Sequence, residues 1–153
     1  MTDEAVRNPP PDRPQITVSL TYDDVEGAAR WLCEVFGFTE LTETRVEWEG
    51  KLVHTELTLG ERGLIMLGPP FADRASPRTR GGTTSMMSAY VDDVDAHFAH
   101  AKETGAQIVA GLEDTFYGDR TYRVSDMEGH HWMFAQRVAD IPPQEWDFTG
   151  SNG

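Results

Sequence analysis

Two stretches of the chain carry the same order of hydrophobic and polar positions. Residues 17–37 and 85–106 each begin with a short run in which apolar and polar residues alternate, and each continues into an acidic helix start. The Asp-Asp-Val triplets begin at Asp23 and Asp92, and glycines that would end the helices stand at Gly37 and Gly105. The spacing between the triplets and the spacing between the glycines agree to within one residue. This agreement indicates an internal repeat.

A period of two follows each predicted helix. Alternating segments lie at 38–49, 51–60 and 63–68 in the first half, and at 107–113, 120–125 and 130–136 in the second. Such segments, separated by Gly-containing turns, predict β-strands. The sequence therefore predicts an α+β fold of two βαβββ modules. Each helix would cover one face of its sheet, and the other faces would curve together into an eight-stranded cleft.

The composition along the chain predicts its boundaries. Residues 1–14 are rich in proline and are expected to form a disordered or loosely attached lead-in. Residues 15–138 would form a single domain, with module one at 15–68, a linker at 69–84 and module two at 85–138. The tail, 139–153, carries Trp146 and Phe148, which could pack on the body or on a second subunit.

Charge and composition exclude several classes of protein. Thirteen Lys and Arg residues against 26 Asp and Glu residues give a net charge of -13 among 153 residues, which argues against nucleic-acid binding and favours cationic or neutral partners. No apolar run approaches the roughly 20 residues of a membrane span. One cysteine cannot form an internal disulfide, and the first residues lack a signal-peptide pattern, so we expect a cytoplasmic protein.

Several segments together resemble the glyoxalase / bleomycin resistance / extradiol dioxygenase superfamily, also called vicinal oxygen chelate proteins. They are the paired modules, the Asp-Asp-Val helix starts, HTELTLGERGLIML (54–67) and YGDRTYRVSDMEGHHWMFA (117–135). The resemblance covers residues 16 to 137. It implies the superfamily fold and a homodimer with a cleft for a small-molecule ligand, but it names no substrate, since one fold hosts many chemistries.

The metal-dependent members of that superfamily hold a divalent ion with His, Glu or Gln side chains from the first and last strands of the modules. The matching positions of this sequence are Thr17, Met66, Met86 and Met133. A thioether is a poor ligand for such ions in an oxygen and nitrogen site. We therefore predict no metal and no other cofactor.

A shift of register by one residue would bring His130 or His131 to the last of these positions. The strand pattern argues against that shift. If Trp132 and Phe134 pack under the helix, then His131 and Met133 face the cleft and a single histidine remains there.

His54 and Glu56 are the candidate catalytic residues, because alternation places them two residues apart on one strand face. A histidine beside a carboxylate could act as a general base or grip a polar ligand. The alternative is a solvated strand face with an incidental ion pair. A non-standard metal site of His54, Glu56 and His131 is a third reading, if the strands meet.

Candidate ligand-binding residues come from both modules. Thr17 and Ser19 would form one polar wall of the cleft, and the opposite wall would carry Met86, Ser88 and Tyr90. Methionine gives a soft surface suited to a flat ligand, although side chains could also fill the cleft themselves.

Further candidates lie in loops and on the last strand. His131 and Met133 would face the cleft, and Arg120 could either clamp an anionic group or tie its own loop to its strand. Trp48 and Phe71 flank turns, where they could close over a ligand.

Three functions follow from these residues. The first is metal-independent binding or sequestration of a small aromatic or cationic molecule, as in the bleomycin resistance members. The second is a lyase, isomerase or dioxygenase-type enzyme with an altered site that uses His54 and Glu56. The third is a scaffold that kept the fold and lost the cleft.

Overall fold

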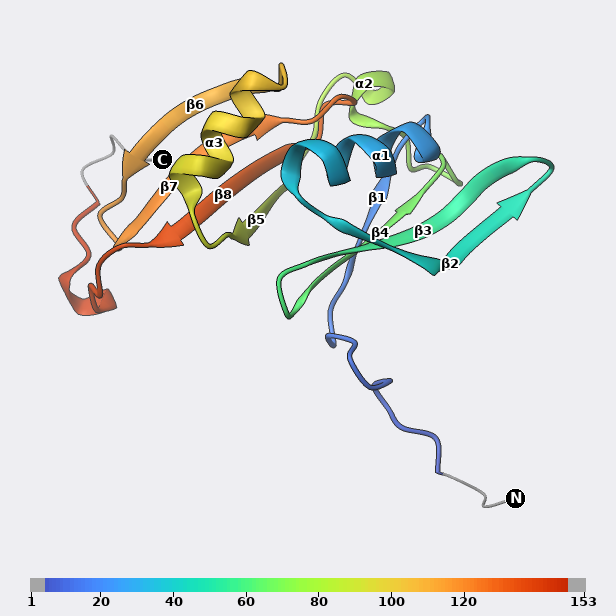
Figure 1. The fold of residues 1–153 in the computed structure, drawn as a ribbon, viewed down its shortest axis with the longest axis horizontal. Coiled ribbons are helices and arrows are strands. Elements are labelled where there is room, and N and C mark those ends of the chain that lie inside the picture. The colour runs from blue at the N-terminus through green and yellow to red at the C-terminus, as the bar shows by residue number, and fades with distance from the viewer. Residues whose placement is uncertain (1–4, 149–153) are drawn as a thin grey trace. The chain divides into compact units, whose positions relative to one another are not determined.

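A computed structural model gives the structure of the chain and describes residues 5–148 (Figure 1). It divides into two compact units, one up to Ala75 and one from Ser76 onward. Each unit is built around its own four-stranded sheet.

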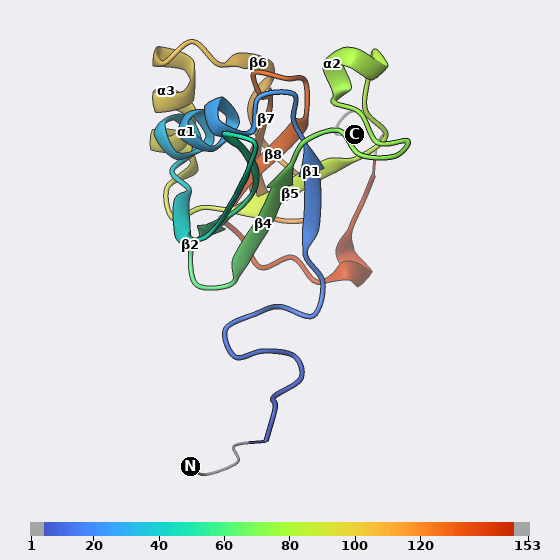
Figure 2. The same cartoon turned by 90° about the vertical axis from the view of Figure 1, so that its right-hand side faces the viewer.

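The first unit contains one helix and one sheet. Its elements are β1 (Val18–Thr21), α1 (Val25–Phe36), β2 (Thr39–Trp48), β3 (Lys51–Leu59) and β4 (Gly63–Gly68). The strand order is β1-β4-β3-β2, with β1 parallel to β4 and the other pairs antiparallel. Figure 2 shows β1 and β4 side by side, and because the two strands are parallel, β1 ends beside the point where the linker leaves β4.

The second unit repeats this order after a short helix. Its elements are α2 (Pro77–Arg80), β5 (Met86–Tyr90), α3 (Val94–Glu103), β6 (Gln107–Asp114), β7 (Asp119–Ser125), β8 (His131–Arg137) and a final 3-10 turn, η1 (Pro143–Glu145). The strand order is β5-β8-β7-β6, with β5 parallel to β8. The predicted pair of βαβββ modules is therefore confirmed.

The two long helices start and end as their sequences predict. The Asp24 carboxylate accepts from the Gly27 amide at 2.9 Å, and the Asp93 carboxylate accepts from the Ala96 amide at 3.0 Å. Both contacts satisfy amides that a helix start leaves unpaired. Gly37 caps α1 at φ 82°; α3 ends at Glu103 with Thr104 as its cap, and Gly105 follows directly at φ 86°.

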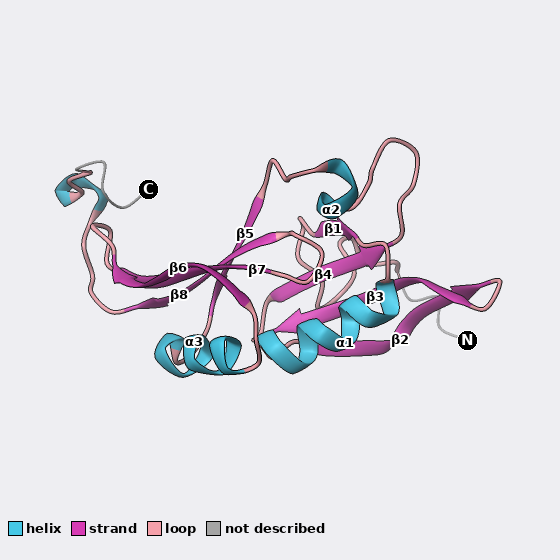
Figure 3. Ribbon diagram, turned by 90° about the horizontal axis from the view of Figure 1, so that it is seen from above, coloured by secondary structure: helices cyan, strands magenta, loops and turns pink. Residues whose placement is uncertain are grey.

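Each helix covers one face of its sheet, as Figure 3 shows for α3 and its strands. In the first unit the buried face carries Leu20, Leu57 and Leu67 against α1. In the second unit it carries Trp132 and Phe134. The ring of Phe134 on β8 and the ring of His97 on α3 have centroids 4.2 Å apart. The predicted packing of the last strand under the helix is therefore correct.

The linker contains structure that its sequence pattern did not indicate. Phe71 and Arg74 form an isolated antiparallel bridge, with backbone hydrogen bonds of 3.2 and 3.0 Å. Ser76 then caps α2 by accepting from the Thr79 amide, with Pro77 in its first turn. A serine followed by proline is a helix-start signal, but a helix of one turn has no hydrophobic period to reveal it.

The described part of the tail packs on its own unit. Phe116, in the loop between β6 and β7, lies with its ring centroid 6.3 Å from that of Trp146 and 5.5 Å from that of Phe148. The Trp146 indole donates to the carbonyl of Ile141 at 3.0 Å. This favours packing on the body, one of the two alternatives left open by the sequence. Within residues 5–148, no helix is both long and apolar enough to cross a membrane.

Candidate functional site

One face of the first sheet, opposite α1, carries the polar candidates of module one. Ser19 and Glu56 are both register partners of Met66, so these three side chains share a face. His54 joins them because it lies two residues from Glu56 on β3. Thr17 is half-buried and lies just before β1.

His54 and Glu56 are in direct contact on this face. The His54 Nε2–H donates to Glu56 Oε2 at 2.9 Å. The other carboxylate oxygen, Oε1, pairs with the guanidinium of Arg13, which lies in the predicted lead-in. The Glu56 side chain is only 7% exposed, whereas that of His54 is 35% exposed. Glu56 thus orients His54 while both of its own oxygens are engaged.

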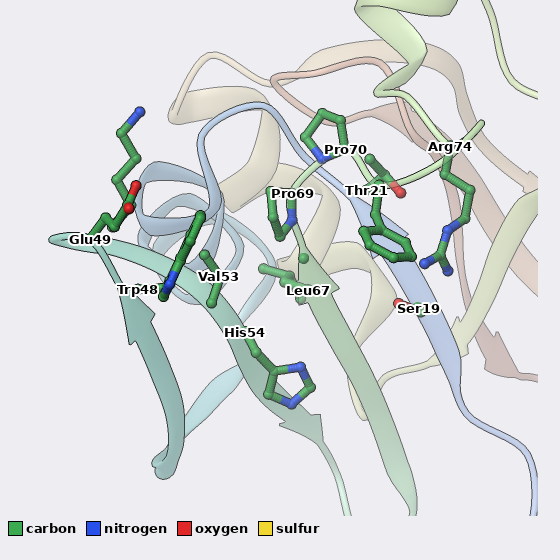
Figure 4. A pocket seen from close by; sticks show the side chains of 13 residues that line it. Ser19, Thr21, Trp48, Glu49, Val53, His54, Leu67, Pro69, Pro70 and Arg74 are labelled. Carbon is green, nitrogen blue, oxygen red and sulfur yellow. The ribbon is translucent and has the colours of Figure 1, made fainter.

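A pocket of about 700 Å³ opens beside His54, and its lining belongs entirely to the first unit (Figure 4). It lies where β1, β3 and β4 meet the linker. The residues that line it are Ser19, Thr21, Trp48, Glu49, Lys51, Val53, His54, Leu67, Gly68, Pro69, Pro70, Phe71 and Arg74.

Two exposed aromatic rings flank this pocket. Trp48, at the end of β2, is 67% exposed, and Phe71, in the linker, is 70% exposed. Figure 4 places Trp48 and Arg74 on opposite sides, with Leu67 and His54 between them. Phe71 belongs to the Arg74 side because the two residues are bridged through their backbones. Large apolar rings left in water on both sides of a hollow are typical of a binding site.

The pocket contains Ser19 and His54 from the predicted strands, and also Trp48 and Phe71, the two rings predicted to lie near turns. Thr17 and Glu56 do not line it, but Glu56 contacts His54, which does. The prediction missed Lys51 and Arg74. The three arginines of the linker were the available signal, but a segment without periodicity does not show which of them turns toward the sheet.

The module-two candidates lie on one face of the second sheet. Register pairs Met86 with His131, and Ser88 with Met133, on the face opposite Trp132 and Phe134. Tyr90 belongs to the same face, since it pairs with Ala135. Its hydroxyl donates to Asp119 Oδ2 at 2.7 Å, and this hydrogen bond raises the pKa of Tyr90 above its ordinary value of 10.0.

Arg120 lies on the other face of this sheet. Its guanidinium donates to Asp114 at 2.7 Å and to Asp95 of α3 at 3.1 Å. It alternates along β7 with Asp119, so it points toward the helix while Asp119 points toward Tyr90. Arg120 therefore ties its strand to α3, and it does not line the pocket.

The side chains present do not fit a divalent metal of the kind that the resemblance implies. The four matching positions offer one hydroxyl and three thioethers, at Thr17, Met66, Met86 and Met133. Between residues 5 and 148, no group of three or more His, Cys, Asp or Glu side chains could hold a metal.

Comparisons with known proteins agree with this fold. An uncharacterized protein of Mycobacterium tuberculosis H37Rv is 32% identical over 137 residues, which cover 86% of this chain and 79% of that protein. The crystal structure of TioX from Micromonospora sp. ML1 superposes with a TM-score of 0.66 at 35% identity, over 82% of this chain and 99% of TioX. TnmS3, an antibiotic binding protein from Streptomyces sp. CB03234, gives a TM-score of 0.65 at 21% identity, over 80% and 93% of the two chains.

The match to a family model covers almost the whole of both modules. The model describes the Glyoxalase/Bleomycin resistance protein/Dioxygenase superfamily and matches residues 15–134. With two βαβββ modules in the structure and these relatives beside it, the chain belongs to that superfamily.

Proposed function

We propose that this protein binds a small aromatic molecule in the pocket of its first unit and acts by holding the molecule. The observation that carries the proposal is the pair of exposed rings, Trp48 and Phe71, on opposite sides of that pocket. A planar ligand between them would bury both rings and stack on them.

The rest of the lining supports this proposal. Val53, Pro69 and Pro70 supply apolar surface, while Ser19 and His54 supply a few polar groups. A volume of about 700 Å³ lies in the range of small-molecule sites, which are mostly apolar with a few fixed polar groups. The fold can serve such a role, because TnmS3, which shares it, is an antibiotic binding protein.

Alanine variants of the two rings test the proposal. We expect Trp48→Ala and Phe71→Ala each to weaken binding of naphthalene-2-carboxamide, a neutral planar probe, by about tenfold in titration calorimetry. Trp146→Ala is the matched control, since Trp146 is also exposed but packs on Phe116 outside the pocket. Equal affinity in all four proteins would contradict the site, and no binding to the wild type would contradict the proposed function for this ligand class.

A second candidate function is an enzyme of the lyase, isomerase or dioxygenase type. The 2.9 Å contact between His54 and Glu56 favours it, since a carboxylate that orients an imidazole is a common arrangement of a general base. Replacing both residues with alanine should then abolish turnover of any substrate found. Turnover that survives the double substitution would remove this assignment.

We further infer that the protein forms a homodimer. Support comes from apolar side chains left in water at the β1 and β5 edges of the two sheets: Ile16 is 88% exposed, Val18 37% and Met86 44%. The cytoplasmic location stays a prediction, which cell fractionation would test.

A further inference from the structure

The charges that line the pocket differ in sign from the charge of the whole chain. The chain carries a net charge of -13. The pocket instead gathers two cationic side chains, Lys51 and Arg74, against a single carboxylate, that of Glu49. A ligand in the pocket therefore meets an excess of hydrogen-bond donors and positive charge at contact distance.

Arg74 is held beside one of the two aromatic walls. Its guanidinium carbon lies 5.9 Å from the centroid of the Phe71 ring, and the backbones of the two residues are bridged in both directions. Its side chain is exposed and extends toward Ser19 (Figure 4). The backbone bridge holds the main chain of Arg74 in place, and the cation–π contact with Phe71 sets the direction of its side chain.

We propose that the pocket selects planar aromatic acids, with the ring between Trp48 and Phe71 and the anionic group on the Arg74 guanidinium. This inference rests on the proposed function, because it names the ligand class of the same site. A guanidinium presents a planar fork of N–H donors that matches a carboxylate, and such charge-assisted hydrogen bonds are stronger than neutral ones. Lys51 adds a second cation, and the Ser19 hydroxyl adds a neutral donor.

The same geometry disfavours a cationic ligand, which the net charge alone had suggested. Glu56 is the buried carboxylate nearest to His54, and it is already paired with Arg13 and with His54. A cation in the pocket would thus lie beside Lys51 and Arg74 with only Glu49 to offset them. Screening by salt reduces the distant field of the chain far more than it reduces contacts at hydrogen-bond distance.

Three probes that share one naphthalene ring and carry a negative, a neutral and a positive substituent test this proposal. They are naphthalene-2-carboxylate, naphthalene-2-carboxamide and 2-naphthylmethylammonium, titrated into the full chain at neutral pH and about 0.15 M salt. We expect the carboxylate to bind about tenfold more tightly than the carboxamide, and the ammonium to bind most weakly. Arg74→Gln should remove this preference, because it weakens binding of the carboxylate about tenfold more than binding of the carboxamide.

The controls separate this inference from the proposed function. Arg62→Gln, in the turn between β3 and β4, changes the charge equally outside the pocket and should keep the preference. Equal binding of carboxylate and carboxamide, with both lost in Trp48→Ala, would overturn the selection for acids and leave the proposed function in place. A preference that persists in Arg74→Gln would overturn the role of Arg74. Failure of all three probes to bind would overturn both proposals.

Discussion

The carboxylate of Glu56 joins two parts of the first unit. One oxygen pairs with Arg13, upstream of β1, and the other accepts from His54 on the same strand. Its side chain is nearly buried, so both contacts form where water competes weakly. This residue therefore holds the lead-in against the sheet next to the pocket.

Removing the charge of Glu56 should destabilise the fold. We expect Glu56→Gln to lower the free energy of unfolding by about 1–3 kcal/mol, since a buried charged hydrogen-bond network loses one partner. Urea denaturation measures this loss. Glu61→Gln, an exposed carboxylate in the β3–β4 turn, is the matched control and should change stability by less than about 0.5 kcal/mol. Equal stability of the two variants would refute the structural role of Glu56.

Tyr90 provides a prediction on pH. The pKa of Tyr90 is raised mainly by its hydrogen bond to Asp119, so the fold favours the neutral phenol. The stability from this contact is fully present below the ordinary pKa of about 10 and is lost as pH rises through the raised value.

The Asp119→Asn variant should lower the pKa of Tyr90 toward its ordinary value, because the negative partner is gone. The ultraviolet absorbance of tyrosinate follows this change, with Tyr90→Phe identifying the contribution of that residue. Asp114→Asn, whose carboxylate pairs with Arg120 instead, should leave the titration of Tyr90 unchanged. A titration that is the same in all these proteins except Tyr90→Phe would show that Asp119 does not set the pKa.

From the sequence, a site residue could be predicted mainly where strand alternation sets the face to which its side chain points. His54 and Glu56 share a face because they lie two positions apart on one strand. Arg120 had two possible roles, and the choice depended on whether α3 brought Asp95 close to it. Trp48 and Phe71 could be recognised as rings near turns, but only the path of the linker places them on one pocket.

At the scale of elements, the helix starts carry separate and measurable stability. Asp92 and Asp93 are adjacent, but it is Asp93 that caps α3 by accepting from the Ala96 amide. We expect Asp93→Ala to lower the free energy of unfolding by about 1 kcal/mol. Asp92→Ala, one residue outside the cap, should have little effect, and denaturant melts of the two variants give the comparison. Equal losses would mean that general charge at the helix start, and not the cap, is responsible.

The strands and the long helices were predictable because each is long enough to repeat its hydrophobic period several times. The strand predicted at 51–60 agrees within one residue with β3 at Lys51–Leu59, and the strand predicted at 63–68 has the same bounds as β4 at Gly63–Gly68. The single turn of α2 and the Phe71–Arg74 bridge were not predictable, since each rests on a few local hydrogen bonds without a repeating pattern. Of these two features, the Phe71–Arg74 bridge is the one that completes the pocket.

At the scale of the whole molecule, the exposed apolar edges lead to an expected assembly. Light scattering coupled to size-exclusion chromatography should give a mass of about twice 17.1 kDa for the homodimer. Replacing exposed Val18 at the β1 edge with lysine should shift the protein toward the monomer if that edge forms the interface. A wild-type mass equal to one chain at micromolar concentration would refute the dimer.

The net charge leads to a kinetic expectation. An aromatic acid must approach a chain of net charge -13 before it reaches Arg74. We expect its association rate to increase as salt is raised from about 0.02 to about 0.3 M, because the distant repulsion is screened. Stopped-flow fluorescence with naphthalene-2-carboxylate measures this rate, and the carboxamide, which carries no charge, should be insensitive to salt. A rate that falls with salt would show that the field at the pocket mouth attracts anions from a distance.

The lining of the pocket runs from Ser19 to Arg74 without using any residue of the second unit. Ligand preference is therefore encoded in one uninterrupted stretch of sequence. A relative that exchanged this stretch by recombination would acquire a complete new specificity in one event, while its second module continued unchanged. In the laboratory, a mutagenised cassette that spans this stretch would sample every wall of the pocket at once.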